Sequence, residues 1–150
     1  MILLSRRSLL SIAAVVDIAL HSRPTPVSAK AMAARHSLPP RHLETVMQAL
    51  VRNGILKGVR GPRGGYELAR ERRKITAGDV VRAAMQATGE ENLPPMPKSR
   101  LVDEIIAPVV KKAGDRFLGY LDAITIDDLC KTAEDDKVFG SLMPEQDFTI

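Results

Sequence analysis

The sequence predicts a mainly α-helical fold with one small β-hairpin, and three observations support this class. Hydrophobic residues make up 45% of the 150 residues but aromatic residues only 3%, so the core must be aliphatic, which favours packed helices over a large sheet. Apolar residues recur along several segments at the spacing of one helix face. One stretch, 57–68, instead joins two extended runs through a Gly- and Pro-rich turn, which is typical of a hairpin.

The first expected helix covers residues 6–21. Its apolar residues lie at helical spacing, and we expect them to pack into the core: Leu9, Ile12, Ala13, Val16, Ala19 and Leu20. Arg6 and Arg7 before an apolar run also resemble a twin-arginine export signal. Asp17 interrupts this run, however, and the run is shorter than the roughly 20 residues that a membrane span requires. We therefore expect a core helix in a cytoplasmic protein that has no membrane partner.

A short helix, a turn and an amphipathic helix follow. Ser28 is a suitable N-cap for the short helix at 29–36, and a Pro-containing turn comes after it. The amphipathic helix runs to about Arg52 and ends near Gly54, which can adopt the left-handed conformation. One side of this helix is apolar and is expected to pack into the core, through Leu43, Val46, Met47 and Leu50. The other side is polar and is expected to be exposed, with Arg41, His42, Glu44, Thr45 and Gln48.

A basic hairpin comes directly after these helices. Lys57, Arg60 and Arg63 lie in it, and Gly64 and Gly65 follow its turn, where the missing Cβ allows another backbone to approach closely. Two helices joined by a short turn and followed by a basic hairpin predict a winged helix-turn-helix, in which the hairpin is the wing.

The rest of the chain predicts two further helices and a long one between them. We expect Ile75 to pair with the hairpin and a helix at 78–88 to pack through Val80, Val81, Ala84 and Met85. A long helix over about 101–123 has apolar residues along one face, as in a helix that packs along another helix. Pro108 either kinks this helix or marks the start of its regular part. A short last helix is expected at 127–134.

These elements suggest four parts. Residues 89–99 contain three prolines and are interpreted as a linker. The expected organisation is a winged helix-turn-helix domain (1–88), the linker (89–99), a dimerisation helix with a short last helix (100–136), and an aperiodic tail (137–150) that we expect to be mobile.

Charge and composition narrow the function. The net charge is +4 and the isoelectric point about 9.5, with basic residues in excess up to Arg82 and acidic residues in excess from Glu90, which favours a polyanionic partner for the front half. The single cysteine, Cys130, excludes an intramolecular disulfide and a multi-cysteine metal site, and the three histidines show no ligand spacing. The sequence shows no nucleophile–base pair, no phosphate loop before a helix and no paired carboxylates in an apolar setting, so we do not expect an enzyme. We expect neither a metal nor a cofactor.

The hairpin also carries a resemblance. Residues 58–68, Gly-Val-Arg-Gly-Pro-Arg-Gly-Gly-Tyr-Glu-Leu, are similar to the S-V-R-G-P-x-G-G-Y-x-L signature of the Rrf2 family of bacterial transcription regulators. Other parts of the chain resemble the motif helices, the segment after the wing and the end of the dimerisation helix, at 27–33, 43–44, 50–56, 75–81 and 121–129. The resemblance implies a homodimer, expected to act as a repressor, whose two recognition helices enter successive major grooves of a near-palindromic operator in double-stranded DNA.

The expected DNA contacts are of two kinds, phosphate contacts that set position and affinity and base contacts that set sequence preference. Phosphates are expected to meet Arg41, Arg52 and Lys57, with Arg6 or Arg7 in addition. Bases are expected to meet the start of the recognition helix, at Arg41, His42, Glu44 and Thr45, and the minor groove is expected to receive Arg60 and Arg63. Ser28, Gly64 and Gly65 complete the candidate DNA-binding residues. Two of these residues have an alternative role without DNA contact: Glu44 as a carboxylate on the helix surface and Arg63 as a solvated residue of the turn.

Many family members hold an iron–sulfur cluster through three cysteines in the loop before the long helix. By the resemblance, those cysteine positions fall near Asn92, Lys98 and Glu104, and the following histidine position falls near Ala107. Cluster ligation of this kind requires thiolates. The chain is therefore expected to be a member that lacks the cluster.

Two alternatives stay open. A winged helix can be retained for binding proteins after its affinity for DNA is lost. The regulator can also respond to a small ligand or to oxidation of Cys130, which lies in or near the last helix and is either a buried small hydrophobe or a sensor thiol.

Overall fold

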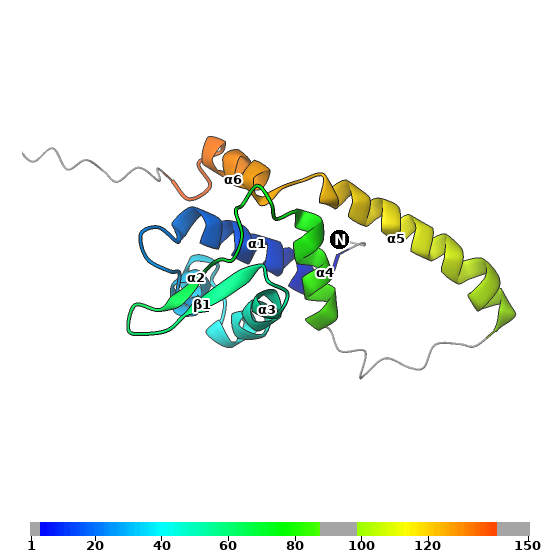
Figure 1. The fold of residues 1–150 in the computed structure, drawn as a ribbon, viewed down its shortest axis with the longest axis horizontal. Coiled ribbons are helices and arrows are strands. Elements are labelled where there is room, and N and C mark those ends of the chain that lie inside the picture. Colours follow the sequence, from blue (N-terminus) through cyan, green and yellow to red (C-terminus); the bar gives the residue numbers. More distant parts are fainter. Residues whose placement is uncertain (1–3, 88–98, 141–150) are drawn as a thin grey trace, which may run out of the picture.

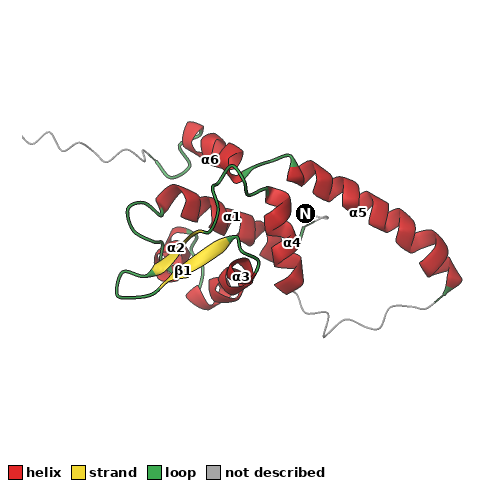
Figure 2. Ribbon diagram, in the orientation of Figure 1, coloured by secondary structure: helices red, strands yellow, loops and turns green. Residues whose placement is uncertain are grey.

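The computed structural model of the chain describes residues 4–87 and 99–140. Within these ranges helices dominate and one two-stranded antiparallel sheet forms the hairpin, so the predicted fold class is confirmed (Figure 1, Figure 2). No helix of these ranges has the length and apolar character needed to cross a membrane. In chain order the elements are α1 (Arg6–His21), α2 (Ala29–Arg35), α3 (Pro40–Arg52), β1 (Leu56–Val59), β2 (Gly65–Leu68), α4 (Ala77–Ala87), the π-helical segment η2 (Leu101–Ile106), α5 (Ala107–Asp122) and α6 (Ile126–Asp135).

Local capping sets most helix boundaries close to the predicted ones. The N–H of Ala31 donates to the Oγ of Ser28 at 3.1 Å, so Ser28 is the N-cap of α2 as expected. Gly54 follows α3 with φ of 71°, the left-handed conformation that the sequence predicts.

α1 packs into the core as expected, but Ile12, Val16, Ala19 and Leu20 are only partly buried against the core cluster, and other residues of the helix are fully buried. Its buried residues are Ser8, Ser11, Ala14, Val15, Asp17 and Ile18, whereas the side chain of Leu9 is 37% exposed. α3, α4 and α6 all pack against α1. Because apolar residues surround most of α1, their spacing alone does not select the buried side, and the neighbouring helices decide it.

A single hydrophobic cluster joins the front of the chain to α6. Its buried members include Leu50 of α3, Ile75, and Ile126 and Cys130 of α6. On α4, Val80, Val81 and Ala84 are buried as predicted, but Met85 is 56% exposed, and Ala83 is buried instead.

The starts of α4 and α6 are joined by backbone pairing. Thr76 and Thr125 each cap a helix through reciprocal hydrogen bonds with an aspartate three residues later. The two threonines form an antiparallel bridge, and the N–H of Ile126 donates to the carbonyl of Ile75 at 2.8 Å. The expectation that Ile75 pairs with the hairpin is therefore wrong, because the free edge of β2 is already paired with Val27.

The long helix extends away from the other helices (Figure 1). Its regular part begins at Ala107, so Pro108 lies in the first turn, where a missing N–H is tolerated. The preceding η2 is π-helical, with the N–H of Ala107 donating to the carbonyl of Val102. No residue of η2 or α5 is buried. At the end of α5, Arg82 of α4 donates two hydrogen bonds to Asp122, at 2.6 and 2.8 Å.

Candidate nucleic-acid interface

α2, a short turn and α3 form the helix-turn-helix. In the turn, Ser37 adopts a φ of 53° and the N–H of Leu38 donates to the carbonyl of Ala33 at 2.9 Å. Pro40 occupies the first turn of α3, where its fixed φ suits a helix start. This turn sets α3 at an angle to α2 (Figure 1).

α3 divides into a buried and an exposed side, as its periodicity predicts. Its buried residues are Leu43, Val46, Met47, Ala49 and Leu50. The candidate base-reading residues all lie on the exposed side: Arg41, His42, Glu44 and Thr45. Arg52, in the last turn, is exposed as well. The geometry therefore leaves one face of α3 free to enter a groove of DNA.

The wing presents its arginines at an exposed tip. β1 and β2 pair in antiparallel register, with Val59 opposite Gly65, so the residues between them form the tip. Arg60 and Arg63 are exposed there, and Gly61 adopts a φ of 119° that favours glycine. Lys57 is opposite Glu67 in the register, and its Nζ lies 3.9 Å from the Glu67 carboxylate.

The two glycines after the tip are required by contacts inside the protein. A Cβ on Gly64 would lie 2.3 Å from the carbonyl oxygen of Val59, and one on Gly65 would lie 2.3 Å from the carbonyl oxygen of Val27. Val27 and Tyr66 exchange two backbone hydrogen bonds, at 2.9 and 2.8 Å. The wing is thereby attached to the residue that precedes the N-cap of α2. That these glycines also approach DNA stays a prediction.

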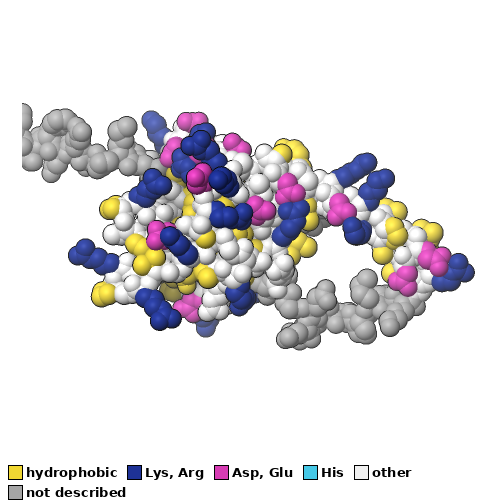
Figure 3. All heavy atoms as spheres, viewed as in Figure 1, with side chains coloured by type: hydrophobic (Ala, Val, Ile, Leu, Met, Phe, Trp, Pro, Cys, Tyr) yellow, Lys and Arg dark blue, Asp and Glu magenta, His cyan; other side chains and the backbone are white. Residues whose placement is uncertain are grey.

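The arginines of the candidate interface have no carboxylate partner in the part of the chain that the structure describes. Among the described residues, Arg41, Arg52, Arg60 and Arg63 form no ion pair, whereas most charged pairs lie elsewhere in the fold, such as Arg82 with Asp122. Figure 3 shows Lys and Arg side chains projecting from several sides of the globular part. Unpaired guanidinium groups are the ones that can neutralise phosphates without first losing another partner.

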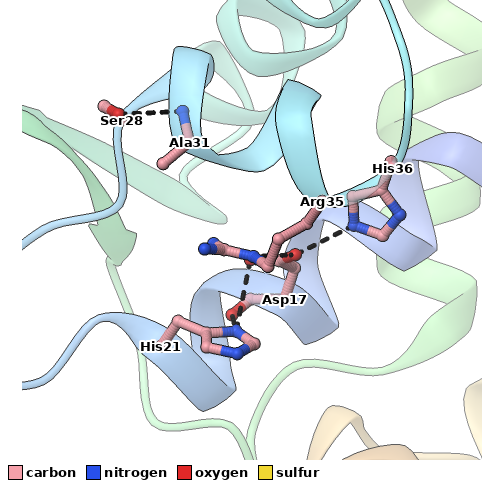
Figure 4. A network of polar contacts seen from close by, with 6 residues as sticks. All are labelled: Asp17, His21, Ser28, Ala31, Arg35 and His36. Carbon is pink, nitrogen blue, oxygen red and sulfur yellow. Dashed lines mark hydrogen bonds and ion pairs between the residues drawn. The ribbon is translucent and has the colours of Figure 1, made fainter. Parts of the chain in front are cut away.

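A buried carboxylate, which the sequence analysis treated only as an interruption of an apolar run, lies under α2. Asp17 is fully buried, and Arg35 donates to it from Nε at 2.9 Å and from Nη2 at 2.6 Å (Figure 4). The Nε2 of His36 donates to the same carboxylate at 2.9 Å, and the Nδ1 of His21 lies 3.3 Å from it. The hydrogen bonds from Arg35 to Asp17, together with the charge of that carboxylate, hold the pKa of Arg35 above its usual value. The sequence did contain a signal for this ion pair, because a charged residue such as Asp17 within an apolar helix requires a partner when it is buried.

Cys130 lies in the core rather than at a reactive surface. Its side chain is fully buried on α6. Burial raises the pKa of the thiol, which lowers the fraction of reactive thiolate. This environment supports the interpretation of Cys130 as a small hydrophobe and gives no support to a redox sensor.

Three comparisons with known proteins bear on this geometry. A family model described as Rrf2, iron-dependent transcriptional regulator, matches residues 4–132. The chain belongs to the Rrf2 family. It is 34% identical over 131 residues to the HTH-type transcriptional regulator slr0846 of Synechocystis, covering 84% of this chain and 86% of that one. It is 28% identical over 125 residues to the HTH-type transcriptional regulator IscR of Pectobacterium atrosepticum, covering 83% of this chain and 76% of that one.

Solved structures of Rrf2-type regulators share the fold. IscR of T. potens superposes with a TM-score of 0.68 at 31% identity, covering 89% of this chain and 90% of that one. CymR, the global cysteine regulator of B. subtilis, superposes with a TM-score of 0.67 at 28% identity, covering 88% of this chain and 98% of that one. The Rrf2 chain described here is accordingly a DNA-binding transcription regulator of this type.

The residues of this chain do not fit the cysteine-ligated cluster of other family members. Its one cysteine is Cys130, buried in the core. Of the positions that the resemblance assigns to ligands, Asn92 and Lys98 lie outside the described residues, Glu104 accepts two hydrogen bonds from Arg100, and Ala107 has no donor atom in its side chain. In the described ranges, no three His, Cys, Asp or Glu side chains form a set that could hold a metal ion.

Proposed function

We propose that this Rrf2-family regulator binds a near-palindromic operator in double-stranded DNA as a homodimer, in the cytoplasm, and represses transcription without holding an iron–sulfur cluster. The observation that carries the proposal is the connected surface formed by α3 and the wing. Val27 exchanges two backbone hydrogen bonds with Tyr66 of β2 next to the N-cap of α2, which attaches the wing to the helix-turn-helix. A fixed arrangement of helix and wing is what recognition of one DNA geometry requires.

The contacts follow from the side chains and their positions. Arg41, Arg52 and Lys57 contact phosphates, although Lys57 must first separate from Glu67. His42, Glu44 and Thr45 contact base edges, with Arg41 beside them, and a carboxylate such as Glu44 accepts a hydrogen bond from the amino group of cytosine. The hydroxyl of Ser28 accepts the capping bond of α2 and still has its own proton to donate to a phosphate.

The wing arginines read groove shape. Arg60 and Arg63 enter the minor groove, which is most attractive to arginine where it is narrow, in A·T-rich segments. The tip is exposed on both sides of the turn, and Gly61 keeps that turn tight.

We expect Arg60→Gln to weaken binding to an operator fragment by roughly tenfold to a hundredfold, because one guanidinium leaves the minor groove. The slope of log affinity against log salt should also fall by about 1. Lys111→Gln is the control. It removes the same charge from an exposed i,i+4 pair on α5 and should leave the affinity nearly unchanged. Gel shifts at several salt concentrations measure both quantities, and equal affinities for the two variants would rule out a DNA-contacting wing.

Exposed apolar side chains on η2 and α5 support dimerisation. Leu101, Ile105, Val109, Val110 and Tyr120 are each at least 60% exposed. A long helix with such a face, projecting from the globular part, is unfavourable in water unless another surface covers it. A second copy of the same helix, crossing it about a two-fold axis, covers both faces at once.

Val109→Glu is expected to convert the dimer to a monomer, because it places a carboxylate in the centre of this apolar face. Sedimentation velocity at micromolar concentration would measure the change in mass. Lys111→Gln, on the charged side of the same helix, should remain dimeric. A Val109→Glu variant with the mass of the wild-type assembly would show that α5 does not form the interface.

A further inference from the structure

A cleft of about 510 Å³ lies between the wing tip and the connection from α1 to α2. Five of the ten residues that line it have polar side chains, namely Arg35, Arg63, His21, Thr25 and Ser28. No Asp or Glu occurs among the described residues that line it. The two arginines and the hydroxyls of Thr25 and Ser28 can donate hydrogen bonds, whereas the Nδ1 of His21 already donates to the carbonyl oxygen of Asp17 at 2.8 Å. Four of the five polar side chains therefore suit an acceptor-rich ligand.

The larger cavity of the fold has a different character. It encloses about 780 Å³ between the end of α1, the base of the wing and α6, and its lining combines four arginines with three glutamates. Two of those arginines are already engaged, Arg70 at 4.0 Å from Asp79 and Arg72 at 2.7 Å from Asp127. Mixed and paired charges of this kind select no anion, which leaves the smaller cleft as the stronger candidate.

Arg35 gives the cleft a fixed set of donors. Asp17 accepts from its Nε and Nη2, which leaves Nη1 without a hydrogen-bond partner in the described part of the chain. The Arg35 side chain is bound to the buried Asp17 carboxylate, and because 30% of it is exposed, it still reaches solvent. Figure 4 shows this guanidinium lying between α1 and α2 on the side of Ser28. A guanidinium that is already immobilised loses little entropy when it binds a ligand.

Arg63 supplies the net positive charge. The Asp17 and Arg35 charges cancel, whereas Arg63 approaches the cleft from the wing and forms no ion pair among the described residues. An anion in the cleft would therefore connect the wing tip to α2 through charge-assisted hydrogen bonds.

We propose that this cleft is an oxyanion site of the phosphate class. One source of the oxyanion is a backbone phosphate beside the minor groove that the wing enters, and this source rests on the proposed function. The other source is a small free phosphate-class anion, which would fix the wing against α2 without DNA. Both sources use the same donors, and the experiment below separates them.

The test compares Ala31→Glu with Ala34→Glu in the full chain. Both alanines are exposed on α2, and both substitutions add one carboxylate, but only Ala31 lines the cleft. In the first arm, inorganic phosphate is titrated into each protein, and the NMR shifts of the Thr25 and Gly64 amides and of the Arg35 Nε–H are followed. In the second arm, the affinity for an operator fragment is measured at fixed salt, and Ala31→Glu should weaken it about tenfold more than Ala34→Glu does.

The outcomes assign the source. The site is supported if phosphate causes saturable NMR shifts that are lost in Ala31→Glu and kept in Ala34→Glu. If the two variants also bind DNA equally, the site is assigned to a free anion. A selective loss of DNA affinity in Ala31→Glu assigns the site to a backbone phosphate, with or without shifts from free phosphate. The absence of both effects overturns the proposal. If the wild-type chain binds no DNA, the proposed function fails, and the phosphate arm alone decides the site.

Discussion

Asp17→Asn is expected to lower the free energy of unfolding by about 1–3 kcal/mol, because it leaves hydrogen-bond donors around this buried position without their acceptor. The carboxylate is fully buried and accepts from Arg35 and His36. Asparagine has nearly the same shape but carries no charge, and it presents an amide N–H₂ to one of these donors. The guanidinium of Arg35 would then lose its counter-ion, and because 30% of the Arg35 side chain is exposed, water compensates part of that loss.

Asp115→Asn is the matched control. Asp115 accepts from Lys111 at 2.9 Å on α5, where the two side chains are 77% and 63% exposed. The same chemical change there should cost at most about 1 kcal/mol, because water screens and replaces the lost interaction. Urea denaturation at one fixed protein concentration would measure both variants, since the stability of a dimer depends on concentration. Similar losses in the two variants would show that Asp17 is not a structural anchor.

A double variant separates lost charge from lost shape. Asp17→Leu alone leaves Arg35 unpaired, whereas Asp17→Leu with Arg35→Met removes both charges and keeps apolar volume. The double variant should therefore be more stable than the single one. Arg35 is the last residue of α2, so the ion pair can also orient that helix. A double variant that regains stability but binds DNA weakly would show this second role.

Gly65→Ala is expected to destabilise the fold by about 1–3 kcal/mol and to weaken DNA binding in the folded fraction. The new Cβ would approach within 2.3 Å of the Val27 carbonyl oxygen and 2.8 Å of the Ser28 nitrogen, and both are backbone atoms that no side-chain rotation can move away. The strand must therefore separate from the residues before α2. The wing would then lose its fixed position relative to α3.

Gly58→Ala provides the comparison for that variant. Gly58 lies in β1 opposite Tyr66, and a Cβ built on it meets nothing within 4 Å. Its effect on stability should stay within about 0.5 kcal/mol. Chemical denaturation gives the stabilities, and gel shifts under conditions where both variants are folded give the affinities. Equal behaviour of the two glycine variants would mean that the wing is not held by its contact with Val27.

Helix boundaries and the two sides of α3 could be predicted because they depend on residues close together in the sequence. Ser28 caps α2 through an N–H three residues away, and Gly54 ends α3 through its own φ. The polar and apolar sides of α3 follow from helical periodicity, so the exposure of Arg41 and Glu44 could be predicted as well. The tight turn of the wing depends on its own glycines and proline.

The buried side of α1, the anchor at Asp17 and the partner of Ile75 were decided only by the tertiary structure. Asp17 and Arg35 are 18 residues apart, and Ile75 and Ile126 lie in separate elements. α1 is apolar around most of its surface, so several packings satisfy its sequence equally until α3, α4 and α6 are in place. A local pattern fixes which conformation a segment adopts. It does not fix which distant group will compensate a buried charge or occupy the free edge of a strand, because that free energy arises only when the two segments meet.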